Sequence, residues 1–220
     1  MNAAALIVAA GRGTRAGGTL AKQWQPLAGR RVLDVTLEVF LSHPRIARIA
    51  LVLHSDELSQ APSHPGIIPA RGGETRAASV LSGLKALAPS APTHVLIHDA
   101  ARPCLRPQTI DDVLDALETA PGAAPALAVT DALWVGAADY VTGVQDRAGL
   151  YRAQTPQGFH FSSILAAHHA HPGGARDDVE VARAAGLDVA IVPGDEENLK
   201  ITLPEDFARA ERILRARGWT

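Results

Sequence analysis

The sequence predicts an α/β fold in which a mostly parallel sheet carries helices on both faces. Short apolar runs alternate with longer segments whose apolar residues repeat at helical spacing, and Gly or Pro stands between many of them. Such alternation is typical of βαβ units, whose parallel strands are buried on both faces and form continuous apolar runs. The chain has 220 residues, of which 47% are apolar and 20% charged, enough for one globular domain over residues 1–220.

The order of the elements follows from these runs. Strands are predicted at residues 3–10, 46–53, 66–70, 94–98, 123–129 and 189–192. Helices are predicted at residues 31–41, 75–87, 107–117, 161–169, 179–185 and 204–217. The first helix is expected to end before Pro44, because proline stops helix propagation, and the third begins with Pro107 in its first turn.

Residues 130–155 interrupt the alternation. They contain three short β-type runs separated by glycine turns, namely Leu133-Trp134-Val135, Tyr140-Val141-Thr142 and Leu150-Tyr151-Arg152. The segment is aromatic and β-branched, unlike a linker, and so long an excursion from an α/β core usually covers a partner surface. We therefore predict a protruding β-arm over residues 130–155 that covers a partner surface.

Charge and cysteine content exclude several classes of protein. The formal net charge is −2, so no basic field is available to bind nucleic acid nonspecifically. The single cysteine, Cys104, excludes an internal disulfide framework and is expected in a reducing compartment, by default the cytoplasm. The apolar run at residues 3–10 is too short to span a membrane and has no basic segment before it, so neither a membrane anchor nor a signal peptide is expected.

The first predicted strand runs directly into a loop rich in glycine and arginine. This loop, followed by Lys22-Gln23, reads Gly11-Arg12-Gly13-Thr14-Arg15-Ala16-Gly17-Gly18. Glycines at the carboxyl end of a strand let backbone N–H groups approach phosphate oxygens, and the cations suit a triphosphate undergoing substitution. The dinucleotide fingerprint is also satisfied, but Pro26 and the absence of a suitably placed acid argue against it. A plain glycine turn with solvated basic residues is the remaining alternative.

A second candidate site stands at the end of the fourth predicted strand, in His98-Asp99-Ala100-Ala101-Arg102-Pro103. Asp99 could serve Mg²⁺ or ribose hydroxyls, and Arg102 could bind a phosphate. The same spacing fits a strand-end turn with a local ion pair. The residues alone leave both interpretations open.

Five separated motifs, in order along almost the whole chain, resemble one family, the methylerythritol phosphate cytidylyltransferases of the non-mevalonate isoprenoid pathway. The motifs are Ala9-Ala10-Gly11-x-Gly13-x-Arg15 with Lys22-Gln23, Gly72-Gly73-x-x-Arg76-x-x-Ser79-Val80, His98-Asp99-Ala100-Ala101-Arg102-Pro103, Thr155-Pro156-Gln157, and Asn198-Leu199-Lys200-Ile201-Thr202 with Pro204-Glu205-Asp206. Together they are far more specific than any one of them. The resemblance implies a Rossmann-like nucleotidyltransferase fold, a homodimer joined through the β-arm, and a need for Mg²⁺ or another divalent cation.

The resemblance also implies the reaction and the residues that carry it. The phosphate of a polyol phosphate, 2-C-methyl-D-erythritol 4-phosphate, would attack the α-phosphorus of CTP and release pyrophosphate. By position, Arg15 and Lys22 resemble the catalytic pair. Residues that resemble nucleotide contacts are Ala9, Ala10, Gly11, Gly73, Glu74, Arg76, Ser79 and Asp99, the last also near the metal. Residues that resemble substrate-positioning groups are Arg102, Arg147, Thr155, Arg176 and Lys200.

Three positions depart from the family pattern. Ala21 stands where Pro is common before the Lys-Gln pair, and Ala132 stands where Thr is usual. Arg176 stands before Asp177-Asp178 where a Thr is expected, and we hypothesise that its guanidinium replaces the missing hydroxyl contacts to the acceptor phosphate. A solvated residue at a helix start is the alternative for Arg176.

Rival functions remain open at this point. A pentitol phosphate cytidylyltransferase acting on ribitol 5-phosphate shares the His-Asp-Ala-Ala-Arg-Pro motif, and a nucleotide-binding regulator or a nicotinamide-dependent oxidoreductase would belong to other classes. His168, His169 and His171 suggest a metal cluster, but a solvated helix end is the expectation because no other ligand type is suitably spaced. Cys104 is expected to be a buried thiol rather than a nucleophile.

Overall fold

The computed structural model describes residues 2–11 and 20–219, and its centre is an eight-stranded sheet. Seven strands follow the order β10-β7-β11-β6-β1-β4-β5, and the eighth, β12, pairs with β7. Their bounds are β1 Ala3–Ala9, β4 Ile46–Leu53, β5 Ile67–Arg71, β6 His94–Asp99, β7 Gly122–Ala128, β10 Tyr151–Ala153, β11 Gln157–His160 and β12 Val189–Pro193. All six predicted strands are confirmed, and the pairings among β6, β1, β4 and β5 and between β12 and β7 are parallel.

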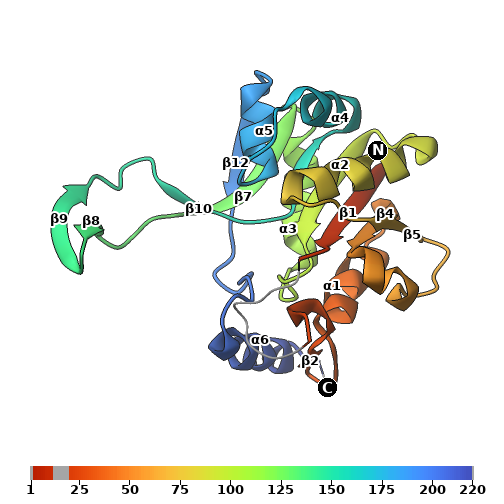
Figure 1. Cartoon of the computed structure of the whole chain (residues 1–220), viewed down its shortest axis with the longest axis horizontal. Helices are drawn as coiled ribbons and strands as arrows, with labels where there is room; N and C mark the ends of the chain where they lie inside the picture. The colour runs from red at the N-terminus through yellow and green to blue at the C-terminus, as the bar shows by residue number, and fades with distance from the viewer. Residues whose placement is uncertain (1, 12–19, 220) are drawn as a thin grey trace.

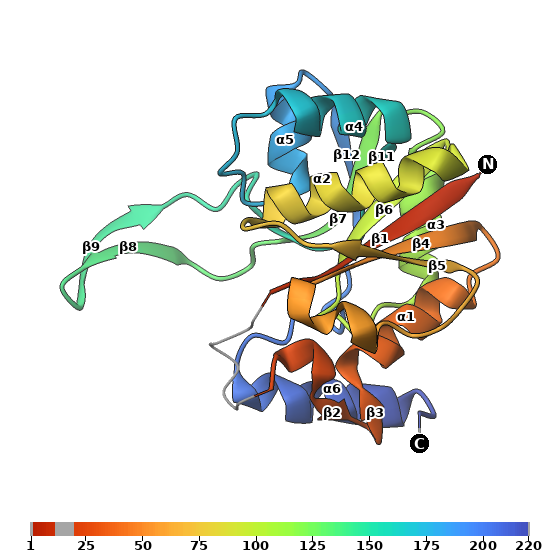
Figure 2. The ribbon, with the colours of Figure 1, turned by 45° about the vertical axis from the view of Figure 1, so that its right-hand side comes forward.

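Helices cover both faces of this sheet, as predicted (Figure 2). They are α1 Val32–Leu41, α2 Arg76–Leu87, α3 Pro107–Ala116, α4 Phe161–Ala170, α5 Asp178–Ala184 and α6 Pro204–Ala216. Alternate residues of β1 serve the two faces because successive side chains of a strand point in opposite directions. Ile7 packs in the core beneath α1 and α3, whereas Leu6 packs in the core beneath α2, α4 and α5.

A third apolar cluster joins the two ends of the chain. It lies between α6, α1 and the short strands β2 Pro26–Leu27 and β3 Arg30–Arg31, and it includes Leu27, Val35, Cys104 and Leu214. Residues 22–31 and the C-terminal helix therefore lie side by side, as Figures 1 and 2 show. This arrangement brings Lys22 and Lys200, distant in sequence, to the same end of the sheet.

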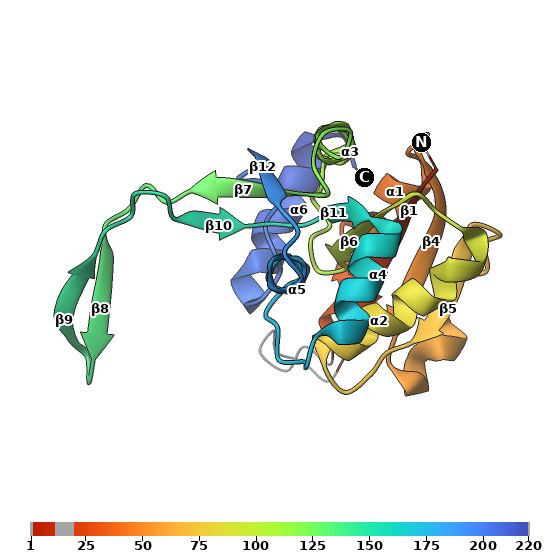
Figure 3. The same cartoon turned by 90° about the horizontal axis from the view of Figure 1, so that it is seen from above.

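The predicted arm is present, although its composition differs from the expectation. Strands β8 Leu133–Ala137 and β9 Tyr140–Gln145 form a separate two-stranded sheet that projects far from the body (Figure 3). The third predicted arm run is not part of that sheet: β10 pairs antiparallel with β7 and so belongs to the central sheet. The arm is thus a hairpin carried at the tip of an extension of two central strands.

Strand β11 was not predicted and carries the Gln of the Thr-Pro-Gln motif into the sheet. It runs antiparallel between β6 and β7. Gly158 makes the fit possible, because a Cβ there would lie 2.4 Å from Val113 Cγ1. No helix in the described part of the chain is long and apolar enough to cross a membrane.

Candidate active site

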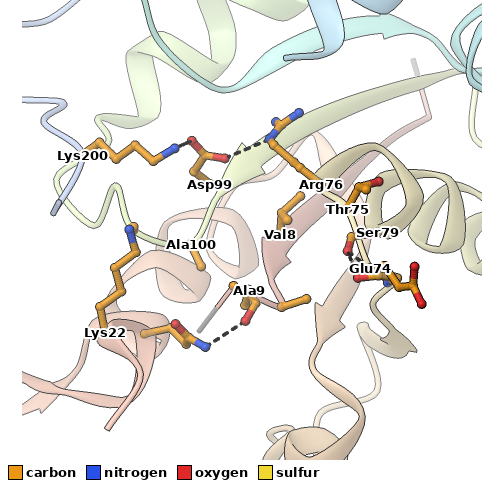
Figure 4. Close-up of a pocket in the computed structure, with 15 residues that line it drawn as sticks. Val8, Ala9, Lys22, Glu74, Thr75, Arg76, Ser79, Asp99, Ala100 and Lys200 are labelled. Carbon is orange, nitrogen blue, oxygen red and sulfur yellow. Dashed lines mark hydrogen bonds and ion pairs between the residues drawn. The ribbon is translucent and has the colours of Figure 1, made fainter. Parts of the chain in front are cut away.

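The main pocket opens at the carboxyl ends of β1 and β6, beside the start of α2. Ligands of open α/β sheets bind at such strand ends. The residues lining it are Val8, Ala9, Ala10, Gly11, Lys22, Gln23, Gly73, Glu74, Thr75, Arg76, Ser79, Asp99, Ala100, Ala101 and Lys200. Every nucleotide-binding residue expected from the sequence is among them, together with Lys22 and Lys200 (Figure 4). Arg15 and Gly13 lie outside the described residues.

Gln23 ties the lysine-bearing segment to the end of β1. The segment forms a short 3-10 helix, Lys22–Trp24. The buried amide of Gln23 donates from Nε2 to the Ala9 carbonyl at 2.9 Å. The two residues of the Lys-Gln pair therefore have different roles. Gln23 anchors the segment inside the fold, and Lys22 faces the pocket.

The glycine pair after β5 allows a close approach to α2. A Cβ on Gly72 would lie 2.4 Å from Ala10 Cβ, and one on Gly73 would lie 2.5 Å from Ala78 Cβ. The buried Ser79 hydroxyl accepts from the Gly73 N–H at 3.1 Å, and Thr75 caps α2 by accepting from the Ala78 N–H. The positive end of the α2 dipole thus points at the pocket wall, where it favours an anionic ligand.

Asp99 is a carboxylate on the wall of the pocket, at the end of β6. Its Oδ2 accepts from Lys200 Nζ at 2.7 Å, and its Oδ1 lies 3.6 Å from Arg76 Nε. Burial alone would raise the pKa of this carboxyl, but Lys200, Arg76 and Arg102 outweigh it and hold the pKa well below its usual range. Asp99 is therefore ionised at neutral pH and sits among cations that an incoming triphosphate could also engage.

Lys22 contacts the stretch of backbone that carries Lys200. Lys22 donates from Nζ to the Ile201 carbonyl at 2.9 Å, and the Ile201 N–H donates to the Ala101 carbonyl at 2.8 Å. The stretch is held at both ends: the Asn198 amide donates to the Thr155 carbonyl, and the Asp206 carboxylate accepts from two backbone N–H groups before α6. These hydrogen bonds fix the backbone of the Asn-Leu-Lys-Ile-Thr motif and thereby the position of Lys200.

Thr155 and His98 form a buried support beneath Asp99. Burial lowers the pKa of His98 to about 4, so the imidazole is neutral. Its Nε2 faces the Arg102 carbonyl at 3.2 Å, an acceptor only, which places the proton on Nε2 and leaves Nδ1 to accept from the Thr155 hydroxyl at 2.9 Å. That hydroxyl also accepts from the Asp99 N–H, so Thr155 positions the end of β6 rather than presenting a free hydroxyl to substrate.

A second cavity adjoins the first, and Lys200 lines both. The residues around it are Arg102, Leu127, Arg152, Ala153, Gln154, Glu196, Asn198, Leu199, Lys200, Asp206 and Arg209. Arg102 donates to the carbonyls of Asn198 and Ala153, which fixes the wall between the cavities. Four cations against two acids make this cavity suited to a small anionic molecule.

Two predicted substrate-positioning residues lie away from both cavities within this chain. Arg147 stands on the arm, where its guanidinium donates to the Thr130 carbonyl, and Figures 1 and 3 show the arm directed away from the body. Arg176 is exposed just before α5, where its backbone N–H donates to Glu180. The hypothesis that the Arg176 guanidinium binds the acceptor phosphate stays a prediction.

The predictions for the histidines and for the cysteine have different outcomes. His169 is exposed, as expected for a solvated helix end, but for His168 that expectation is wrong: it is buried and faces Asp178. Cys104 is buried as expected, and burial raises the pKa of its thiol to about 12. Sequence reasoning missed the anchoring roles of Gln23 and Asn198; the available signal was an amide residue standing close to a lysine in each motif.

The described residues offer few ligands for a metal ion. Within residues 2–11 and 20–219, no group of three or more His, Cys, Asp or Glu side chains could hold one. Mg²⁺, however, commonly binds through one or two carboxylates, water and substrate phosphates. The ionised Asp99 on the pocket wall fits that pattern, so a cation shared with a nucleotide is compatible with the site.

Known proteins are similar to this chain in sequence and in architecture. A family model described as 2-C-methyl-D-erythritol 4-phosphate cytidylyltransferase matches residues 3–216. An enzyme of that name from Cereibacter sphaeroides (strain ATCC 17023) is 60% identical over 219 residues, which cover 97% of each chain. A bifunctional enzyme IspD/IspF from Ruegeria pomeroyi is 62% identical over 221 residues, covering 98% of this chain and 57% of that protein.

Solved structures agree with these relatives. The crystal structure of 2-C-methyl-D-erythritol 4-phosphate cytidylyltransferase from Thermus thermophilus is 31% identical, with a TM-score of 0.81 over 98% of this chain and 100% of that one. The corresponding structure from Francisella tularensis is 25% identical, with a TM-score of 0.85 over 97% and 100%. The family model, the relatives and the folds coincide over nearly the whole length, and the chain belongs to the 2-C-methyl-D-erythritol 4-phosphate cytidylyltransferase family.

Proposed function

We propose that this chain transfers the cytidylyl group of CTP to 2-C-methyl-D-erythritol 4-phosphate. The products are 4-diphosphocytidyl-2-C-methyl-D-erythritol and pyrophosphate, within isoprenoid precursor synthesis. The observation that carries the proposal is the pair of adjoining cavities that share Lys200, one opening at the strand ends of an α/β sheet and the other lined by arginines. The family named by relatives at 60% identity supplies the identity of the two substrates.

In this proposal the nucleotide occupies the main pocket. Ser79 and the backbone near Gly73 and Glu74 take the base, Asp99 lies toward the ribose and metal, and the triphosphate lies toward Gly11 and Lys22. Arg76 is the first residue of α2, and its guanidinium, 3.6 Å from Asp99, adds positive charge to the same wall. Support comes from the narrow glycine wall and the positive end of α2, since both favour a bound anion over a neutral ligand.

The acceptor phosphate would lie in the second cavity and be held near Lys200. One of its oxygens attacks the α-phosphorus of CTP, the bond from that phosphorus to the bridging oxygen of the β-phosphate breaks, and pyrophosphate leaves with the electron pair. Charge accumulates on the α-phosphate oxygens, so a preorganised cation there lowers the barrier. Lys22 and Arg15 are proposed for that role, with Lys200 and Arg102 positioning the acceptor.

We propose Mg²⁺, or another divalent cation, as the cofactor. When bound, it would neutralise phosphate charge, with Asp99 as the protein carboxylate that faces it. The strong lowering of the Asp99 pKa supports this assignment because a metal-facing carboxylate has to be ionised. The protein's own part is to hold that carboxylate in place through the Asp99 N–H and Thr155.

We further propose that the chain works as a homodimer joined by its arms. The hairpin exposes Trp134 at 69%, Tyr140 at 77% and Val144 at 75%, an apolar surface that a monomer would leave in water. A second copy is the proposed occupant, since a two-fold axis would bury both hairpins at once. Arg147, remote from the site of its own chain, would then be available to the site of the partner.

A turnover assay tests the proposed function. Pyrophosphate release is measured with CTP and either 2-C-methyl-D-erythritol 4-phosphate or ribitol 5-phosphate, in Mg²⁺ buffer. The proposal expects turnover with the first acceptor and kcat/KM at least about 100-fold lower with the second, about 2.7 kcal/mol of discrimination. Preference for the pentitol phosphate would favour the alternative cytidylyltransferase. Binding of CTP with no release of pyrophosphate in the presence of either acceptor would indicate a regulator.

A further inference from the structure

A buried carboxylate ties the nucleotide pocket to the helices behind it. Asp178 opens α5 with a side chain that is 0% exposed. Its Oδ2 accepts from Arg76 Nη2 at 2.7 Å, and its Oδ1 lies 3.2 Å from His168 Nε2. Both oxygens are therefore engaged, as a fully buried charge requires.

The partner on the pocket side is Arg76, whose guanidinium stands between two carboxylates. Nη2 is held by Asp178, and Nε faces Asp99 at 3.6 Å. A planar guanidinium held at Nη2 by one carboxylate and facing a second at Nε has little freedom to rotate, so Asp178 helps to set the plane that Arg76 presents to the pocket. Burial works to lower the pKa of Arg76, but the two carboxylates raise it overall, so the cation is permanent.

The helix start that carries Asp178 has its own support. Gln157 accepts at Oε1 from the backbone N–H groups of Asp178 and Val179, at 3.0 and 3.2 Å, and donates from Nε2 to Asp177. These bonds hold the first backbone turn of α5 in place, and none of them involves His168. His168 acts on the side chain instead: it contacts Oδ1 of the Asp178 carboxylate and takes no part in the backbone hydrogen bonds to Gln157.

We infer that His168 is a positioning residue for nucleotide binding, acting through Asp178 on Arg76. Its imidazole, 2% exposed, donates from Nε2 to the Asp178 carboxylate, which keeps the other carboxylate oxygen directed at Arg76. His168 is absent from the lining of the main pocket, so its effect on a ligand there has to pass through this chain of contacts. The inference rests on the proposed function, which places CTP in that pocket.

The first test is CTP affinity, measured by isothermal titration on the full chain without acceptor. His168→Leu should raise the CTP Kd about 10-fold, the scale for losing a hydrogen bond to a charged group. His168→Gln, whose amide can reach the carboxylate, should recover to within about 3-fold of wild type. His169→Leu, one residue along α4 and exposed, is the matched control and should leave the Kd unchanged. The acceptor KM should be unchanged in all three.

A double-mutant cycle separates this role from general weakening of the fold. In an Arg76→Ala background, His168→Leu should change the CTP Kd less than about 2-fold, because the element through which it acts is gone. An independent 10-fold effect in that background, or a normal Kd in His168→Leu itself, overturns the inference. Should the leucine variant not fold, His168→Asn, too short to reach Asp178, carries the same expectations. Wild type that binds CTP without turnover contradicts the proposed function alone; wild type that does not bind CTP contradicts both.

Discussion

Lys200 Nζ lies 2.7 Å from Asp99 Oδ2, although the two residues are 101 positions apart in the chain. The pair marks the boundary between the two cavities, because Lys200 lines both and Asp99 lines the main pocket. The carboxylate is 13% exposed and the lysine 42%, so the contact is buried on one side and open to ligand on the other. An exposed ammonium that already faces a fixed anion is well placed to exchange part of that contact for a phosphate.

This relationship predicts how Lys200 contributes to acceptor binding. Lys200→Gln keeps most of the side-chain volume and removes the charge, so the acceptor KM should rise about 10-fold and kcat should also fall. The KM for CTP should change much less, because Arg76 and Lys22 remain. Steady-state kinetics with each substrate varied in turn makes the measurement. An increase in the CTP KM alone would place Lys200 on the nucleotide instead.

Lys22 is predicted to act on the transition state. Lys22→Ala should lower kcat by about 10²-fold or more, the scale for one preorganised contact to developing charge, with a smaller effect on the CTP Kd. Lys22→Arg should also be impaired, because the wider guanidinium does not replace a compact ammonium beside the Ile201 carbonyl. Single-turnover rates and CTP titration separate the two effects. Near-normal turnover in Lys22→Ala would remove this residue from the chemistry.

His98 predicts a dependence of stability on pH. Burial lowers its pKa in the folded state from 6.5 to about 4, whereas the unfolded chain binds a proton near the ordinary value. The unfolded state therefore binds more protons between these values, and the free energy of unfolding should fall as the pH drops from about 6.5 to about 4. The loss from this residue is at most about 3 kcal/mol.

Urea denaturation at pH 7.5, 5.5 and 4.5 measures the effect. His98→Gln serves as the reference, since it lacks the titrating group while other acid-sensitive residues stay in place. The difference between wild type and variant should shrink or reverse as the pH falls. A difference that is constant over this range would contradict the assignment of a neutral, buried imidazole.

The arm predicts that each active site is built from two chains. Lys22→Ala and Arg147→Ala should each be nearly inactive as pure dimers. After joint unfolding and refolding in equal amounts, about half of the dimers are mixed, and one site of each mixed dimer carries both defects while the other is intact. Activity should therefore recover to roughly a quarter of wild type.

A matched control uses two residues that face the same pocket within one chain. Refolding Lys22→Ala together with Lys200→Ala should restore nothing, because every mixed site then keeps one defect. Formation of mixed dimers is confirmed with a mass tag on one variant. Absence of recovery in the Arg147 mixture, with mixed dimers present, would leave the arm without a part in the partner's site.

Much of the fold follows from the apolar runs, and the exceptions have physical causes. Each predicted strand and helix is found within one or two residues because burial on both faces or on one helical stripe leaves a clear periodicity. Strand β11 was not predicted because it is four residues long, contains Gly158 and follows a proline. Its pairing with the neighbouring strands β6 and β7 specifies it. Strand β10 looked like part of the arm because pairing partners cannot be read from a run of three residues.

The candidate site was predictable to a similar degree. The motifs shared with the family supplied the pocket-lining residues, whereas the residues that hold them in place could not be identified from the sequence. His168 resembled its exposed neighbour His169, and only the packing of α4 against α5 shows that it is buried beside Asp178. The resemblance named Thr155 as a substrate-positioning residue, but its hydrogen bonds to His98 and Asp99 could not be predicted, because β6 is distant from it in sequence.

The central claim is that an acceptor phosphate attacks the α-phosphorus of CTP, and the fate of isotopic label tests it most directly. The chain is incubated with 2-C-methyl-D-erythritol 4-phosphate and CTP labelled with ³²P at either the α or the γ position, and the products are separated. The account predicts that α label appears in the cytidylylated polyol and γ label only in pyrophosphate, with Lys22→Ala slowing both in proportion. Release of γ label as inorganic phosphate, with no α label in the polyol product, would contradict it.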